Sequence, residues 1–128
     1  MQPRDVLVVE DDPELNELVG AYATLAGFTY RAALNGGEAL SQATSHAPAA
    51  IVLDLMLPDM SGFDVCSRLK ASTATTSVPI IILTALDSAE ARKKGLECGA
   101  AEYLTKPFDP DVLIRLLARY APSDPRPA

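Results

Sequence analysis

The fold of this chain is decided by the stretch Ala49-Ala50-Ile51-Val52-Leu53-Asp54-Leu55-Met56-Leu57-Pro58-Asp59, in which an apolar run ends in a carboxylate. Short apolar runs bounded by loop residues are typical of buried strands. Open α/β sheets place their chemistry where the carboxyl ends of the strands run into loops. The stretch therefore predicts a buried strand that presents Asp54 at a functional edge of a sheet.

Three other runs end in polar residues in the same way. Val6-Leu7-Val8-Val9 is followed by Glu10-Asp11-Asp12, a later run ends at Thr84, and the last ends at Lys106-Pro107. Because the carboxyl ends of parallel strands meet at one edge, the sequence predicts a single polar cluster built from four strand ends.

Short β-branched runs alternate along the chain with longer segments of helical period. This alternation is the pattern of β/α units around a parallel sheet, and five such units are expected. The strands are expected at 6–9, 29–33, 49–53, 78–83 and 101–104. The helices are expected at 13–26, 36–47, 62–71, 88–98 and 110–120.

Capping signals mark the starts of three of the expected helices. Asp12 and Asp109 each precede a proline, so each aspartate is placed to cap a helix whose first residue is that proline. The stretch Asn35-Gly36-Gly37-Glu38 resembles a capping box. Asp59 and Asp64 are assigned turn and surface roles.

Length and composition bound the class of protein. With 128 residues, of which 48% are hydrophobic and 22% charged, the chain suits one compact soluble domain, and its net charge of −6 disfavours direct nucleic-acid binding. No apolar stretch approaches the ~20 residues of a membrane span, and residues 1–5 lack the features of a signal peptide. We therefore expect a cytoplasmic protein without membrane contact. Cys66 and Cys98 show no metal or redox spacing and are expected to pack as small apolar side chains.

The chain is expected to consist of one domain and a short tail. All the expected strands and helices fall within residues 1–120. Residues 121–128 carry Pro122, Pro125 and Pro127 without apolar periodicity, which predicts a proline-rich linker or cut end.

Glu10, Asp11 and Asp54 are expected to meet at the ends of adjacent strands, where their carboxylates repel one another. Protonation or a bound cation relieves such repulsion, and Mg²⁺ favours sparse carboxylate ligation completed by waters and a phosphate. Lys106 adds a positive charge and Thr84 a hydroxyl, both suited to stabilising a transferring phosphoryl group. Asp54 is then the natural nucleophile, since a carboxylate can attack phosphorus to form an acyl phosphate.

These residues occur in four motifs that together resemble a known family. The motifs are Val8-Val9-Glu10-Asp11-Asp12, Leu53-Asp54-Leu55-Met56-Leu57-Pro58-Asp59-Met60-Ser61-Gly62, Thr84-Ala85 and Tyr103-Leu104-Thr105-Lys106-Pro107-Phe108. In order and spacing they resemble the receiver domain of bacterial response regulators, and the resemblance covers nearly the whole chain. It implies a flavodoxin-like three-layer α/β fold, in which five helices flank a parallel five-stranded sheet in the order 2-1-3-4-5.

The resemblance implies that Asp54 is the phosphoacceptor of a Mg²⁺-dependent reaction. It makes Asp11 a direct Mg²⁺ ligand, with Glu10 helping through a bound water. Met56 would lend its backbone carbonyl to the ion, and Asp54 would contact the ion as well as the phosphoryl group.

Further residues receive roles around the phosphoryl group from the same resemblance. Thr84 would contact one phosphoryl oxygen, Lys106 would pair with another, and Ala85 would be small enough to leave room. The Lys106–Pro107 peptide bond would be cis. Tyr103 would be the switch aromatic that turns inward when Thr84 is drawn to the phosphate, although from the residues alone it fits a core or interface position equally well.

The implied function is a phosphoacceptor switch in a two-component phosphorelay rather than a turnover enzyme. The donor would be the phosphohistidine of a sensor histidine kinase or of a histidine phosphotransfer protein. The new charge would alter the face formed by the fourth helix, the fifth strand and the fifth helix, which would engage a downstream output domain or protein. A homodimer through this face is also considered, but of the acidic pair that one family branch carries there only Glu102 remains, beside Ala101.

Three alternative functions use similar parts. A haloacid-dehalogenase-like phosphatase would place a second aspartate two residues after the nucleophile, where Met56 stands. A flavodoxin would need a phosphate cradle after the first strand, and Glu10-Asp11-Asp12 would repel a flavin phosphate. A pseudo-receiver that docks partners without being phosphorylated stays open, because site residues can be retained without being used.

Overall fold

The computed structural model describes residues 3–122 and shows five strands that alternate with five helices. The strands are β1 (Asp5–Val9), β2 (Thr29–Ala33), β3 (Ala50–Leu53), β4 (Ile80–Thr84) and β5 (Glu102–Thr105). The helices are α1 (Pro13–Leu25), α2 (Gly36–Ser45), α3 (Gly62–Ala71), α4 (Ala89–Glu97) and α5 (Pro110–Ala118). Most of the predicted tail, residues 123–128, lies outside the described residues. None of the helices in the described part is long and apolar enough to cross a membrane.

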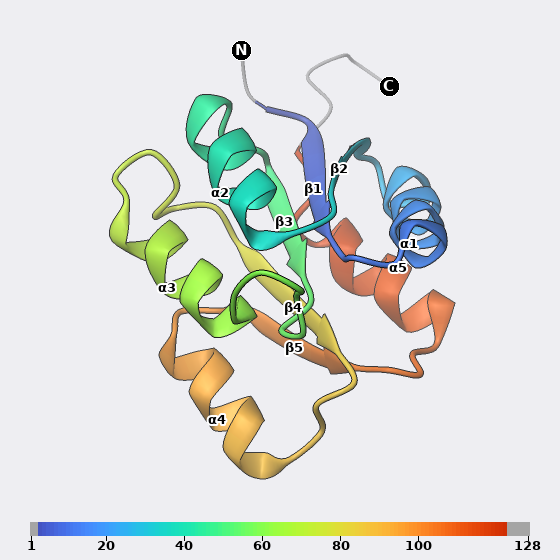
Figure 1. Cartoon of the computed structure of the whole chain (residues 1–128). Coiled ribbons are helices and arrows are strands. Elements are labelled where there is room, and N and C mark those ends of the chain that lie inside the picture. Colours follow the sequence, from blue (N-terminus) through green and yellow to red (C-terminus); the bar gives the residue numbers. More distant parts are fainter. Residues whose placement is uncertain (1–2, 123–128) are drawn as a thin grey trace.

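The five strands form one parallel sheet in the order β2-β1-β3-β4-β5, which confirms the predicted flavodoxin-like α/β fold (Figure 1). β1 pairs with β2 on one side and with β3 on the other, so the chain builds outward from it in both directions. The register sets Val9 level with Ala33 and with Leu53. The residues that follow these three strands therefore start from the same edge of the sheet.

Helices cover both faces of the sheet, with α2, α3 and α4 on one face and α1 and α5 on the other (Figure 1). The central strands β1, β3 and β4 bury side chains on both faces. One apolar core includes Leu7, Ile51 and Ile82, and the other includes Val8, Val52 and Ile81. Strands that are covered on both faces read as continuous apolar runs rather than alternating ones, which explains the sequence pattern of these segments.

The predicted residues Asp12, Asn35 and Asp109 cap the amino ends of their helices. The side chains of Asp12 and Asp109 each accept a hydrogen bond from the backbone N–H two residues further on, at 3.1 and 2.9 Å. Asn35 accepts from the N–H of Glu38 at 2.8 Å and donates to its carboxylate at 2.8 Å. The first bond is one half of the predicted capping box. The other half is not formed, because the Glu38 carboxylate accepts from the side chain of Asn35 rather than from its backbone N–H.

Only β2 has the predicted bounds, and the other four strands differ from the prediction by one or two residues. β4 begins at Ile80 rather than at Val78, because the Val78 N–H closes a turn onto the carbonyl of Thr75 at 3.0 Å and Pro79 has no N–H to donate. β5 begins and ends one residue later than predicted, since its last residue pairs with the last residue of β4. Both strands also end one residue later than predicted, at Thr84 and Thr105, so the sheet reaches further toward its carboxyl edge.

Asn16 ties α1 to the ends of two strands. Its side-chain amide nitrogen lies 3.0 Å from the carbonyl oxygens of Val8 and Glu10 and 3.1 Å from that of Ala33. Its side-chain oxygen accepts a hydrogen bond from the hydroxyl of Tyr30. Because Asn16 is almost fully buried, water cannot take its place as the hydrogen-bond partner of these groups.

We predict that Asn16→Ala lowers the free energy of unfolding by about 2–4 kcal/mol, because it leaves buried carbonyl groups and a hydroxyl without a partner. Urea unfolding of the variant and the wild type measures this difference. Glu17→Ala is the matched control, since Glu17 is the next residue of α1 and is exposed. An Asn16→Ala variant as stable as the Glu17→Ala control would show that the hydrogen bonds of Asn16 do not stabilise the fold.

Candidate functional site

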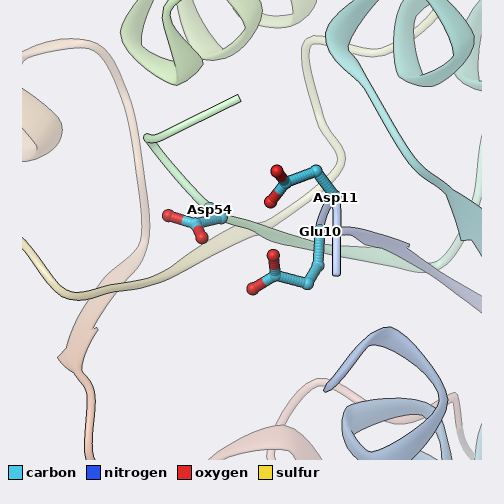
Figure 2. A group of neighbouring side chains, drawn as sticks. All are labelled: Glu10, Asp11 and Asp54. Carbon is cyan, nitrogen blue, oxygen red and sulfur yellow. The ribbon is translucent and has the colours of Figure 1, made fainter. Parts of the chain in front are cut away.

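Three carboxylates meet at the carboxyl edge of the sheet. Glu10 and Asp11 follow β1 and Asp54 follows β3, and Figure 2 shows their three side chains close together. One oxygen from each lies within 4.8 Å of the others. The cluster predicted from the strand ends is therefore formed, and the adjacency of β1 and β3 is the cause.

Glu10 and Asp54 are buried, whereas Asp11 is exposed. Backbone hydrogen bonds extend the sheet pairing to both buried residues. The N–H of Asp54 donates to the carbonyl of Val9 at 3.0 Å, and the N–H of Glu10 donates to the carbonyl of Ala33 at 3.1 Å. The buried carboxylates are thus carried on ordered backbone rather than on free loops.

Lys106 follows β5 and adds a positive charge to the cluster. Its ammonium nitrogen lies 2.5 Å from Glu10 Oε1 and 2.8 Å from Asp54 Oδ2. The Lys106 N–H donates to the carbonyl of Thr84 at 2.8 Å, which sets the residue against the end of β4. The Lys106–Pro107 peptide bond is cis, as the family resemblance implies.

The two buried carboxylates are held in the same manner, each between the lysine and a backbone N–H. Asp54 Oδ1 accepts from the N–H of Met56 at 3.1 Å, and Glu10 Oε2 accepts from the N–H of Asp12 at 3.1 Å. Their other oxygens face Lys106. Each carboxylate is therefore fixed in orientation while its oxygens keep further lone pairs for another ligand.

The charges of the cluster do not balance. Burial raises the pKa of Glu10 more than the hydrogen bond from Lys106 lowers it. Burial also works against the charged form of Lys106, but its hydrogen bonds to Asp54 and Glu10 raise the pKa of the ammonium above its ordinary value. The cluster thus holds three carboxylates and one ammonium, which pairs with two of them. A hard divalent cation is the ligand that fits this set of oxygen donors.

Thr84 and Tyr103 lie on the β4 and β5 side of the cluster. Thr84 is fully buried at the end of β4, and its hydroxyl oxygen accepts from the N–H of Leu86 at 3.4 Å. The Tyr103 hydroxyl donates to the carbonyl of the same Leu86 at 2.7 Å. The structure therefore joins Tyr103 to the loop after Thr84 and not to a carboxylate of the cluster.

The ring of Tyr103 packs against α4. The guanidinium carbon of Arg92 lies 5.1 Å from the ring centroid. A Cβ atom at Gly95 would lie 3.0 Å from two ring atoms of Tyr103, so the glycine makes room for the ring. Tyr103 thus contacts both the loop that follows Thr84 and the fourth helix.

Asn16 is a residue of this region that sequence reasoning missed. It holds the carbonyl of Glu10 from α1 and so fixes the backbone that carries the acidic pair. A polar residue on the inward side of an amphipathic helix, next to Leu15 and Val19, is the signal that could have identified it. Asp59, assigned a turn role from the sequence, also makes specific contacts, which are described below.

Comparison with known proteins gives consistent matches. The family model described as "Response regulator receiver domain" matches residues 6–118. The DNA-binding dual master transcriptional regulator RpaA of Synechocystis is 38% identical over 109 residues, which cover 85% of this chain and 45% of that protein. The chain thus spans less than half the length of this curated relative.

Solved structures give the same result at the level of the fold. A putative response regulator from Chloroflexus aurantiacus superposes with a TM-score of 0.85 at 34% identity, covering 93% of this chain and 98% of that one. The chemotaxis protein CheY4 of Vibrio cholerae superposes with a TM-score of 0.84 at 30% identity, covering 93% and 99%. On the family match and these relatives, the chain belongs to the receiver domains of two-component response regulators.

Proposed function

We propose that this domain is a Mg²⁺-dependent phosphoacceptor switch that takes a phosphoryl group onto Asp54 from a phosphohistidine. The donor is a sensor histidine kinase or a histidine phosphotransfer protein, and we place the reaction in the cytoplasm. The observation that carries the proposal is the buried Asp54 carboxylate, which lies 2.8 Å from the Lys106 ammonium and within 4.8 Å of the carboxylates of Glu10 and Asp11.

In the proposed reaction an oxygen of Asp54 forms a bond to phosphorus while the bond between phosphorus and the imidazole nitrogen breaks. The imidazole leaves with the electron pair and takes up a proton from water. Met56 N–H and Lys106 hold the two oxygens of Asp54 in place, so the nucleophile is oriented before the donor arrives. We propose a phosphoacceptor rather than a turnover enzyme, because an apolar residue, Met56, stands where an aspartate phosphatase would carry its general acid.

The donor set suits Mg²⁺. Asp11 and Asp54 would bind the ion directly, Met56 would offer its backbone carbonyl, and Glu10 would act through a water. When bound, Mg²⁺ supplies positive charge that offsets the charge of the phosphoryl group and of the carboxylates. Lys106 would add the single positive charge of its ammonium, which lies 2.8 Å from Asp54 Oδ2.

The proposed signal passes from Thr84 to the face formed by α4, β5 and α5. Leu86 is hydrogen-bonded on one side to Thr84 and on the other to Tyr103, so a shift of Thr84 toward a phosphoryl oxygen would act on both contacts. Glu102 of this face accepts a hydrogen bond from Tyr120 at 2.5 Å within the chain. Because Glu102 is engaged in this way, we favour an output domain or a separate protein over a second copy as the partner.

We predict that acetyl phosphate or phosphoramidate adds one phosphoryl group to the wild-type protein only when Mg²⁺ is present, and adds none to Asp54→Asn. Asp54→Asn removes the nucleophile and keeps the shape of the side chain. Intact mass measures the modification, and Asp64→Asn, which removes an exposed carboxylate, is the control that should still be modified. No modification of a folded protein that binds Mg²⁺ would favour the docking module instead.

We predict that Lys106→Met lowers the free energy of unfolding without Mg²⁺ by about 1–3 kcal/mol, because two buried carboxylates lose their counter-charge. Added Mg²⁺ should then stabilise the variant more than the wild type, because the ion no longer competes with the ammonium. Urea unfolding with and without Mg²⁺ measures both effects. Lys93→Met is the control, since Lys93 is exposed and pairs only with Glu97 at 4.0 Å among the described residues. A smaller effect of Mg²⁺ on Lys106→Met than on the wild type would count against the shared site.

We predict that the double variant Met56→Asn, Leu86→Glu loses its phosphoryl group at least about tenfold faster than the wild type, because polar groups there can orient an attacking water. In the wild type both side chains are apolar and would shield the acyl phosphate. Intact mass after removal of the donor gives the half-life. Leu25→Glu, at an exposed position at the end of α1, is the control. Equal half-lives for the double variant and the control would contradict the shielding role.

A further inference from the structure

The loop between β3 and α3, residues 54–61, is closed at its base. Met56 and Ser61 form an antiparallel bridge, and the N–H of Gly62 donates to the carbonyl of Leu55 at 2.9 Å. A Cβ atom at Gly62 would lie 2.4 Å from the Cα atom of Leu55, so only glycine permits this close approach. The base of the loop is therefore fixed by backbone contacts.

The tip of the same loop is fixed to a different part of the chain. Asp59 Oδ1 accepts from the N–H of Gly36 at 2.8 Å, and Asp59 Oδ2 accepts from the N–H of Gly37 at 2.9 Å. These groups open α2, beside which the loop runs in Figure 1. The next N–H of the helix, that of Glu38, is bound by Asn35. Asp59 thus completes the capping of α2 from outside the helix.

Two further observations show that this contact is specific. A Cβ atom at Gly36 would lie 2.4 Å from Met60 Cγ, so the loop packs against a position where any larger residue would displace it. The N–H groups of Gly36 and Gly37 lower the pKa of Asp59, which keeps its carboxylate charged at the positive end of the α2 dipole. Asp59 and Met60 together attach the tip of the loop to α2.

Residues 55–61 of this loop, together with Asp11, line a hollow of about 580 Å³. Asp11, Met56 and Asp59 are among the residues that line it. Met56 contributes its N–H to Asp54 and, on the proposed function, its carbonyl to the ion. The position of Met56 therefore depends on a loop that is held at its base by Gly62 and at its tip by Asp59.

We propose that Asp59 is a positioning residue for the Mg²⁺ site, because its contacts with Gly36 and Gly37 hold the loop that carries Met56 against α2. The inference rests on the proposed function and adds a residue to it. Asp59 touches neither the ion nor the phosphoryl group in this role. It acts through the backbone of the loop, as outer-shell groups of metal sites do.

The test compares Asp59→Ala with Asp64→Ala. Both variants remove one exposed carboxylate, but only Asp59 bonds to the start of α2. Calorimetric titration with Mg²⁺ should show about tenfold weaker binding by Asp59→Ala. Asp64→Ala should bind Mg²⁺ within about twofold of the wild type, since salt and water screen the charge of an exposed side chain. Asp59→Asn, which keeps one acceptor, should fall between the two.

Hydrogen exchange without Mg²⁺ supplies a second readout. The amides of Gly36 and Gly37 should exchange faster in Asp59→Ala than in the wild type, and at the wild-type rate in Asp64→Ala. Faster exchange together with unchanged Mg²⁺ affinity would make Asp59 only a helix cap and would overturn the inference. A wild-type protein that binds no Mg²⁺ would instead overturn the proposed function, and the inference with it.

Discussion

Lys106 neutralises only one of the three negative charges that β1 and β3 bring to one edge of the sheet, and the rest of the site follows from that imbalance. Carboxylates placed this close repel one another, and folding has to hold them there against that repulsion. The parallel sheet does so by setting the ends of β1 and β3 level and next to each other. The connection after β1 leads to β2 on one side, and the connection after β3 leads to β4 on the other side. Open α/β sheets leave a crevice for a ligand where the strand order reverses in this way.

Holding the charges in place also requires that their backbone cannot relax. Asn16 fixes the carbonyl of Glu10 from α1, and Met56 N–H fixes an oxygen of Asp54 from the loop after β3. These contacts come from opposite sides of the sheet, because Leu55 and Leu57 on either side of Met56 pack into the core beneath α2 and α3, whereas α1 packs on the other core. The acidic cluster is thus supported from both layers of helices. A site supported in this way is preorganised for the proposed function, because little would have to move to receive a cation or a phosphoryl group.

The sequence predicts those parts of the molecule that depend on local pattern. The order and type of the elements follow from the apolar runs and from the cap residues Asp12, Asn35 and Asp109, because each of these signals lies within a few residues. The acidic cluster is also predictable, since parallel strands have a common carboxyl edge. The contacts of Asn16 and Asp59 are not predictable in this way. Asp59 meets Gly36 across 23 residues of sequence, and only the packed fold brings them together.

In the proposed function, a charge added at Asp54 acts on the face formed by α4, β5 and α5, and the weak packing of α4 indicates how it could do so. α4 has Gly95 as its one buried residue among the described positions, whereas α1 and α3 each bury four. An element with so little buried surface has a low local stability and can change its position at a small energetic cost. A few kcal/mol of differential contact is the scale that shifts a two-state equilibrium almost completely. Tyr103 packs on α4 at Gly95 and bonds to Leu86 beside Thr84, so it lies where the fixed site meets the weakly held helix. The rigid support of the carboxylates and the loose attachment of α4 are therefore complementary in the proposed function, because a phosphorylation switch would need a fixed point for the new charge and a movable element to respond to it.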